Sequence, residues 1–216
     1  RRLLAVGIAA PLLALTVVAA AIAAYPGFDN ATQYLSELGG STAQAPIIFN
    51  GGVFIAGIMA GVAGIGFGLA VYALTEKRIA GAVIAAVFVL AGAGMSASTL
   101  YPWPDPRHMI INLALGIQLA PVLLLWGLAS RRDLPRLKIF LTAIFVIMAC
   151  LTVVTKHMVF PGTVNDANVG WWERAYALVL VGWVGVAAWL LDRKLLQEAI
   201  KSPSGGSVAQ VAAAGE

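Results

Sequence analysis

The chain has 216 residues, of which 60% are hydrophobic and only 11% are charged. A mean hydropathy of +0.88 is too high for a water-soluble domain of this size and places the chain among helical membrane proteins. The formal net charge of +4 does not indicate a nucleic-acid partner, because the predicted topology collects the basic residues on one side of a membrane.

A transmembrane helix needs about 20 consecutive apolar residues, and the chain contains runs of this kind. They predict an all-α fold, an integral membrane bundle of six transmembrane helices. The runs are Leu3–Ala24, Ile47–Leu74, Ile79–Leu100, Met109–Ala129, Ile139–Val159 and Trp171–Leu191. Strands of a β-barrel would alternate over about ten residues, whereas these runs are longer and apolar on all sides. We expect a transmembrane domain at 1–192 and a disordered cytoplasmic tail at 193–216.

The first apolar run has a basic start, as a secretory signal does. It exceeds 20 residues, however, whereas the apolar region of a signal usually has about 7–15. We therefore predict a true first transmembrane helix. The second run spaces Gly57 from Gly61 and Gly64 from Gly68 by four residues, a pattern that predicts close helix packing.

Basic residues set the expected orientation. Given six spans, eleven of the fourteen Lys and Arg residues lie on one side of the membrane, which by the positive-inside rule is the cytoplasm. We therefore predict a multi-pass protein of the inner (cytoplasmic) membrane with both termini inside. The cytoplasmic loops "TEKR" and "SRRDLPRLK" are short and plain.

The predicted outer side holds polar side chains at the helix ends, where we expect an outward-facing pocket. His108 and Asn112 are four residues apart and share a helix face. Glu173 and Arg174 enter the last span. Polar groups inside a membrane are costly unless they are paired, so they should face the bundle or a wet cavity.

Two outer loops flank these residues. The first, "YPGFDNATQYLSELGGS", is predicted to form a lid or a short helix, with Asp29 or Asn30 as its N-cap and Gly39 or Gly40 as its stop. The second, "YPWPDPRHMI", is predicted to be a stiff turn, because proline fixes φ and ends helices.

The stretches "SELG", "STLYPWPDPRHMIINL" and "GWWERAYALVLVGWV" together resemble the domain of unknown function 998 family of prokaryotic membrane proteins. The matching positions are Ser36, Leu38, Gly39, Tyr101, Pro102, Asp105, His108, Gly170, Glu173 and Arg174. The added proline and tryptophan in "PWPDP" depart from the family pattern. The resemblance implies a six-helix integral membrane protein and supplies no activity.

Our leading hypothesis is a pocket for a lipid head group or a small polar ligand in the outer leaflet, with membrane lipids as partners. Its ligand-binding candidates are Tyr101, Trp103, Arg107, His108, Asn112, Lys156, His157, Glu173 and Arg174. The competing interpretations are an interfacial aromatic belt and internal ion pairs, Arg174 with Glu37 or Arg107 with Asp105.

The alternative is an intramembrane, lipid-directed hydrolase or transferase that uses His108 and His157 with a carboxylate. The catalytic candidates are His108, His157, Glu37, Glu173 and Ser36, and the zinc candidates are His108, His157, Glu37 and Asp105. Neither HExxH nor GxSxG occurs, so the sequence does not decide whether the protein is an enzyme.

No cofactor is predicted, although zinc at the residues above or haem b between His108 and His157 is compatible with the pattern. The halves of the chain show no repeat of the kind found in transporters. Homo-oligomerisation and a role as an accessory subunit of a larger membrane complex stay open.

Overall fold

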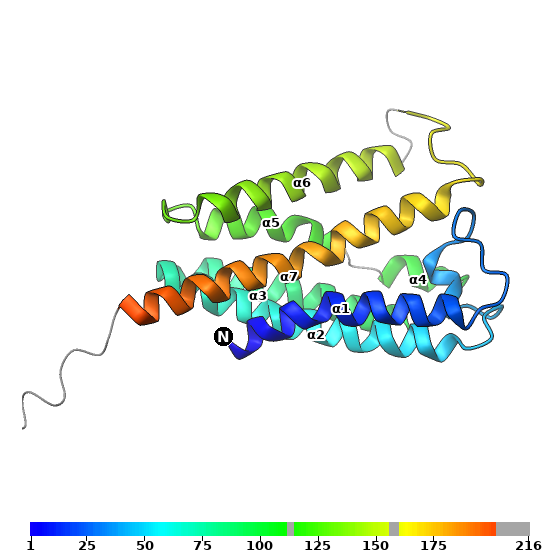
Figure 1. Ribbon diagram of the computed structural model, residues 1–216, viewed down its shortest axis with the longest axis horizontal. Coiled ribbons are helices and arrows are strands. Elements are labelled where there is room, and N and C mark those ends of the chain that lie inside the picture. Colours follow the sequence, from blue (N-terminus) through cyan, green and yellow to red (C-terminus); the bar gives the residue numbers. More distant parts are fainter. Residues whose placement is uncertain (112–114, 156–159, 202–216) are drawn as a thin grey trace, which may run out of the picture.

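The computed structural model describes residues 1–111, 115–155 and 160–201, and every regular element in these ranges is a helix (Figure 1). The all-α prediction is therefore confirmed for this part of the chain. The elements are α1 (Arg2–Ala23), the 3₁₀-helix η1 (Leu35–Gly39), α2 (Pro46–Thr75), α3 (Arg78–Ser98), α4 (Pro106–Ile111), α5 (Leu115–Gly127), α6 (Pro135–Thr155) and α7 (Val169–Lys201).

Five of these helices, α1, α2, α3, α6 and α7, are long and apolar enough to cross a membrane. The predicted fourth span, Met109–Ala129, differs from the structure. It corresponds to the end of the six-residue α4 and to α5, which has 13 residues. At about 1.5 Å per residue, α5 is about 20 Å long and shorter than a bilayer core of about 30 Å. Residues 112–114 between them lie outside the described part.

The last span is longer than predicted. α7 is one continuous helix of 33 residues that ends at Lys201, nine residues into the stretch we assigned to a tail. The segment 202–216 lies outside the described residues.

The α2–α3 interface is the most extensive helix pairing in the described part of the chain and brings small residues together. A Cβ on Gly57 would lie 2.6 Å from the carbonyl oxygen of Gly92, and a Cβ on Gly92 would lie 2.3 Å from that of Gly57. Ser96 donates a hydrogen bond of 2.9 Å to the carbonyl oxygen of Phe54 across the same interface. The packing role predicted for the glycines of the second span is confirmed here.

The centre of the bundle is an aromatic core shared by α2, α3 and α7. The ring of Phe67 lies 5.1 Å from that of Phe88, and the Trp183 ring lies 6.3 Å and 5.9 Å from these two. All three side chains are buried. α1 packs against α2 and α7, and α5 joins α3 to α6, so α7 runs between the two parts of the bundle (Figure 1).

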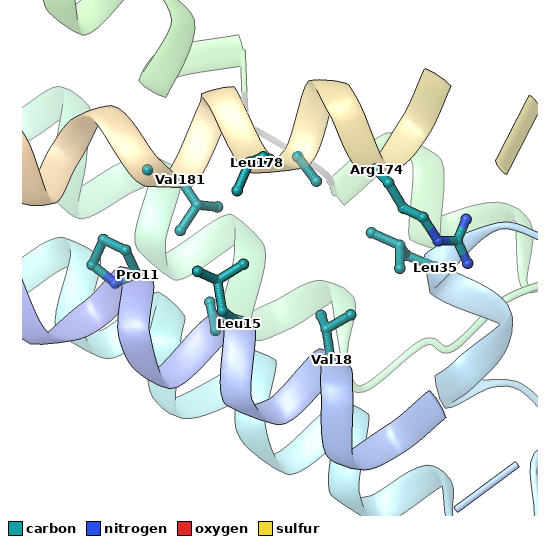
Figure 2. Close-up of a pocket in the computed structure, with 10 residues that line it drawn as sticks. Pro11, Leu15, Val18, Leu35, Arg174, Leu178 and Val181 are labelled. Atoms are coloured by element: carbon teal, nitrogen blue, oxygen red, sulfur yellow. The ribbon is translucent and has the colours of Figure 1, made fainter. Parts of the chain in front are cut away.

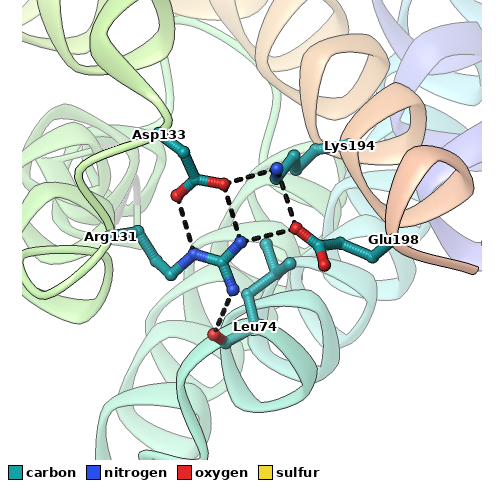
Figure 3. A network of polar contacts seen from close by, with 5 residues as sticks. All are labelled: Leu74, Arg131, Asp133, Lys194 and Glu198. Atoms are coloured by element: carbon teal, nitrogen blue, oxygen red, sulfur yellow. Dashed lines mark hydrogen bonds and ion pairs between the residues drawn. The ribbon is translucent and has the colours of Figure 1, made fainter. Parts of the chain in front are cut away.

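One end of the bundle, which we call the Arg131 end, carries an ionic network (Figure 3). Arg131 binds Asp133 at 2.7 Å, Glu198 at 2.6 Å and the carbonyl oxygen of Leu74 at 2.9 Å. Lys194 pairs with both Asp133 and Glu198. The loop "SRRDLPRLK" between α5 and α6, for which the sequence predicted no particular role, therefore connects the end of α2 to α7.

Acid should weaken this network. Hydrogen bonds from Arg131 and Lys194 hold the pKa of Asp133 well below its usual range. A lowered pKa stabilises the folded state above the ordinary value of about 3.9, and this contribution is lost as the pH falls below it. We expect the melting temperature of the detergent-solubilised wild type to fall more between pH 5 and pH 3 than that of Asp133→Asn.

The matched control is Asp166→Asn, in an exposed loop, which should keep the wild-type pH profile. An identical acid response of wild type and Asp133→Asn would contradict the prediction.

Candidate functional site

At the opposite end, which we call the η1 end, the first loop is fastened to the start of α7. We call these contacts the η1 clamp; its residues are Asn30, Ala31, Gln33, Leu35, Gly170, Glu173 and Arg174. The backbone N–H of Gly170 donates to the carbonyl oxygen of Ala31 at 2.7 Å. A Cβ on Gly170 would lie between 2.5 and 2.8 Å from the carbonyl oxygens of Asn30, Ala31 and Gln33. Only glycine allows this approach.

Arg174 is the main donor of the η1 clamp. Its Nε donates to Oδ1 of Asn30 at 3.0 Å, and its Nη1 donates to the carbonyl oxygens of Gln33 at 3.0 Å and Gly170 at 2.7 Å. The guanidinium also lies over the ring of Phe28, 5.3 Å from its centroid, in a cation–π geometry. The ion pair with Glu37 that we considered is not among the contacts of Arg174.

Glu173 completes the clamp. Its carboxylate accepts a hydrogen bond from the backbone N–H of Leu35, the first residue of η1. A carboxylate at the start of a short helix also satisfies a donor that has no partner within that helix. Neighbouring residues of α7 therefore hold both the loop and η1.

Two carboxylates fold the loop itself. Glu37 accepts from the backbone N–H of the N-cap residue Tyr34 at 2.8 Å, as the third helical residue of a capping box does, and from the amide of Gln33 at 3.0 Å. Asp29 accepts from the backbone N–H of Ala31 and from the hydroxyl of Thr32, and these hydrogen bonds lower its pKa. The predicted short helix exists, but it begins at Leu35 after Tyr34 rather than at Asp29 or Asn30.

The turn between α3 and α4 holds a second polar group. Arg107 pairs with Asp105 at 2.7 Å, as the ion-pair interpretation predicted, and lies 4.1 Å from the Tyr101 ring centroid. Hydrogen bonds from Arg107 lower the pKa of Asp105 to about 2. His108 Nδ1 lies 3.0 Å from the carbonyl oxygen of Tyr101 and 3.2 Å from that of Ser98. Carbonyls only accept, so Nδ1 carries a proton.

The two loops at the η1 end touch. The rings of Tyr34 and Trp103 lie 5.9 Å apart, and a Cβ on Gly40 would lie 2.9 Å from the carbonyl oxygen of Trp103. The η1 clamp and the α3–α4 turn are therefore neighbours. Glu173 and Arg174 belong to the clamp, Glu37 to the loop that the clamp holds, and His108 to the turn.

Several predicted site residues lie outside the described part of the chain: Asn112, Lys156 and His157. Ser36 lies on η1 directly before Glu37. In residues 1–111, 115–155 and 160–201, no three His, Cys, Asp or Glu side chains are grouped so that they could hold a metal ion. A zinc or haem site that uses His157 falls outside these ranges.

The sequence did not reveal a cavity of about 240 Å³ between α1 and α7 (Figure 2). It is lined by Pro11, Ala14, Leu15, Val18, Leu35, Arg174, Ala177, Leu178, Val181 and Gly182. Every lining side chain except that of Arg174 is apolar. Figure 2 shows the guanidinium at one end beside Leu35, where it takes part in the η1 clamp.

The cavity exists because α1 and α7 separate toward the η1 end. Near the Arg131 end the helices touch, since a Cβ on Gly7 would lie 3.1 Å from the Cβ of Ala188. A Cβ on Gly185 would still lie 3.1 Å from Pro11, whereas a Cβ on Gly182 would meet nothing within 4 Å. The small residues Ala14, Ala177 and Gly182 were the only signal of this space in the sequence.

Comparison with known proteins assigns the chain to a family. Residues 8–190 match the family model described as "Protein of unknown function (DUF998)". The chain belongs to this family. The match runs from within α1 to within α7 and confirms the resemblance inferred from the three short motifs, but the family description assigns no activity. No curated protein and no solved structure matches the chain.

An alanine substitution, which adds one methyl group, tests the close approach at Gly170. Gly170→Ala should displace the loop, because the new Cβ would overlap three backbone oxygens, and we expect a lower melting temperature and faster amide exchange in residues 29–37. The control is Gly182→Ala, where the Cβ enters open space and better helix propensity adds up to about 1 kcal/mol. Unchanged exchange in Gly170→Ala would refute the clamp.

Proposed function

We propose that this protein binds a membrane lipid in the outer leaflet, with an acyl chain in the α1–α7 cavity and the head group at the η1 end. The cavity carries the proposal, because its lining is apolar and a single cation stands at one end. Two of its lining residues, Leu15 and Leu178, are 49% and 55% exposed. Both belong to helices long enough to cross a membrane, so a chain can enter from the surrounding bilayer.

The cavity is large enough for one part of a lipid molecule but not for a whole lipid. Pockets for drug-sized molecules usually measure about 300–1,000 Å³, and this cavity of about 240 Å³ is smaller. One hydrocarbon chain fits a narrow apolar space of this kind. The polar part of the ligand then lies outside the cavity, at the membrane boundary.

Arg174 supplies the head-group contact. Its Nη2 is buried and has no hydrogen-bond partner among the described residues, while its other guanidinium nitrogens are bound to the loop. A phosphate oxygen is a strong acceptor for such a donor. The guanidinium carbon lies 5.3 Å from the centroid of the Phe28 ring, so this ring stands beside the proposed head-group position. The excess of basic residues at the Arg131 end supports an outward-facing η1 end.

Filling the cavity tests the proposal. Gly182→Leu should place its side chain in the open space beside Gly182 and exclude the acyl chain. We expect native mass spectrometry of protein extracted in mild detergent to show a retained lipid on the wild type and at least a tenfold smaller lipid-bound fraction on Gly182→Leu.

The matched control is Gly51→Leu, a helical glycine of α2 outside the cavity whose Cβ would meet only Ile47 at 3.9 Å. It should keep the lipid. Equal lipid-bound fractions in Gly182→Leu and the wild type would exclude this cavity as the site.

A second candidate, a hydrolase or transferase, is supported by the orientation of His108. Its Nδ1 faces the carbonyl oxygens of Ser98 and Tyr101. This fixes the proton on Nδ1 and leaves Nε2 as the acceptor of the neutral ring, the arrangement of many catalytic and metal-binding histidines.

The zinc form of this candidate predicts about one zinc ion per purified chain, lost in His108→Ala and kept in Arg107→Gln. The absence of stoichiometric zinc from the wild type would contradict it. The serine form predicts fluorophosphonate labelling that Ser36→Ala abolishes.

A further inference from the structure

A second depression lies on the outside of the bundle, where α2 and α3 face away from α7. It measures about 340 Å³ and is lined by Ile65, Gly68, Leu69, Tyr72, Arg78, Gly81, Ala82 and Ala85. Apart from Arg78, these residues present apolar or aromatic surface. The depression lies in the half of α2 and α3 next to the Arg131 end, far along α2 from the η1 clamp.

The floor of this groove is helix backbone. A Cβ on Gly68 would lie 2.3 Å from the carbonyl oxygen of Gly81, and a Cβ on Gly81 would lie 2.6 Å from that of Gly68. Neither position has room for a side chain, so no side chain from the floor fills the groove. Ile65 and Leu69 form a wall and are 42% and 54% exposed. Since α2 and α3 are both candidate membrane spans, the groove faces lipid.

Arg78 provides a cation at the end of the groove. Its guanidinium carbon lies 5.8 Å from the centroid of the Tyr72 ring, which is also part of the lining. No ion pair of Arg78 with a carboxylate is formed within the described residues. Lys77 precedes it at the same boundary and Glu76 precedes Lys77, so the local charge is positive.

We propose that this groove binds an anionic phospholipid of the leaflet at the Arg131 end, with its phosphate on Arg78 and one acyl chain along the glycine floor. Three observations support this occupant: an apolar groove open to the bilayer, a cation at its interfacial end, and a positive local charge. Basic pockets between transmembrane helices bind anionic head groups in this manner. A zwitterionic lipid can place its acyl chain in the groove, but its head group is attracted less strongly by Arg78 than an anionic one.

This proposal is separate from the lipid in the α1–α7 cavity. The two sites use different helix pairs and lie toward opposite ends of the bundle. They also differ in selectivity, since the α2–α3 groove should prefer a net negative head group. Gly182→Leu should therefore leave binding at the α2–α3 groove unchanged.

The test titrates the detergent-solubilised full chain with dioleoyl phosphatidylglycerol or dioleoyl phosphatidylcholine and counts bound lipids by native mass spectrometry. The wild type should bind its first phosphatidylglycerol more tightly than phosphatidylcholine. Arg78→Gln should weaken the phosphatidylglycerol event roughly fivefold, the effect of one interfacial basic residue. Ala82→Phe, from an exposed position in the lining, should remove the event by filling the groove.

Two controls separate this site from general surface effects. Arg136→Gln removes an exposed charge at the same end, and Val83→Phe adds bulk on α3 outside the lining. Both should bind as the wild type does. Equal binding of the two lipids by the wild type, wild-type affinity in Arg78→Gln and Ala82→Phe, or an equal loss in Arg136→Gln would each overturn the proposal.

Discussion

Two charged residues in the first turns of a membrane-spanning helix impose the central constraint on this fold. Unpaired charged groups inside a membrane carry a large free-energy cost, and α7 is long and apolar enough to cross one, so Glu173 and Arg174 need partners. The protein meets the constraint by folding a loop over them. Backbone groups of Gln33 and Leu35 and the side-chain amide of Asn30 form hydrogen bonds with the two side chains, and among the described residues Nη2 of Arg174 is left without a partner. The position of η1 and the requirement for glycine at position 170 follow from this arrangement.

The α1–α7 cavity lies between two fixed contacts. Near the Arg131 end, Gly7 and Gly185 bring α1 and α7 together, and at the η1 end Arg174 and Leu35 close the space. Helices that are held at both ends but separated between them leave a gap that the small side chains facing it do not fill. The α2–α3 groove has a different origin, because there the backbones touch and the missing side chains create the depression.

Periodic and compositional features were predictable from sequence, and contacts made by the backbone were not. Apolar runs located α1, α2, α3, α6 and α7, and glycine spacing indicated the tight packing of α2. Composition gave no sign that the described part of α5 would have 13 residues. The sequence indicated that Arg174 matters, but not what it contacts. Its acceptors are mainly backbone carbonyl oxygens, which every residue carries. The network of Arg131 was not predicted either, because its partners Leu74 and Glu198 are 57 and 67 residues away in the sequence.

The unbroken course of α7 links the two ends of the molecule mechanically. At about 1.5 Å per residue its 33 residues span about 50 Å, and it carries Glu173 and Arg174 near its start and Lys194 and Glu198 near its finish. The two groups of residues are therefore joined by continuous helical backbone. Sliding or rotating it would strain the η1 clamp and the ionic network together, so each anchor resists displacement that begins at the other.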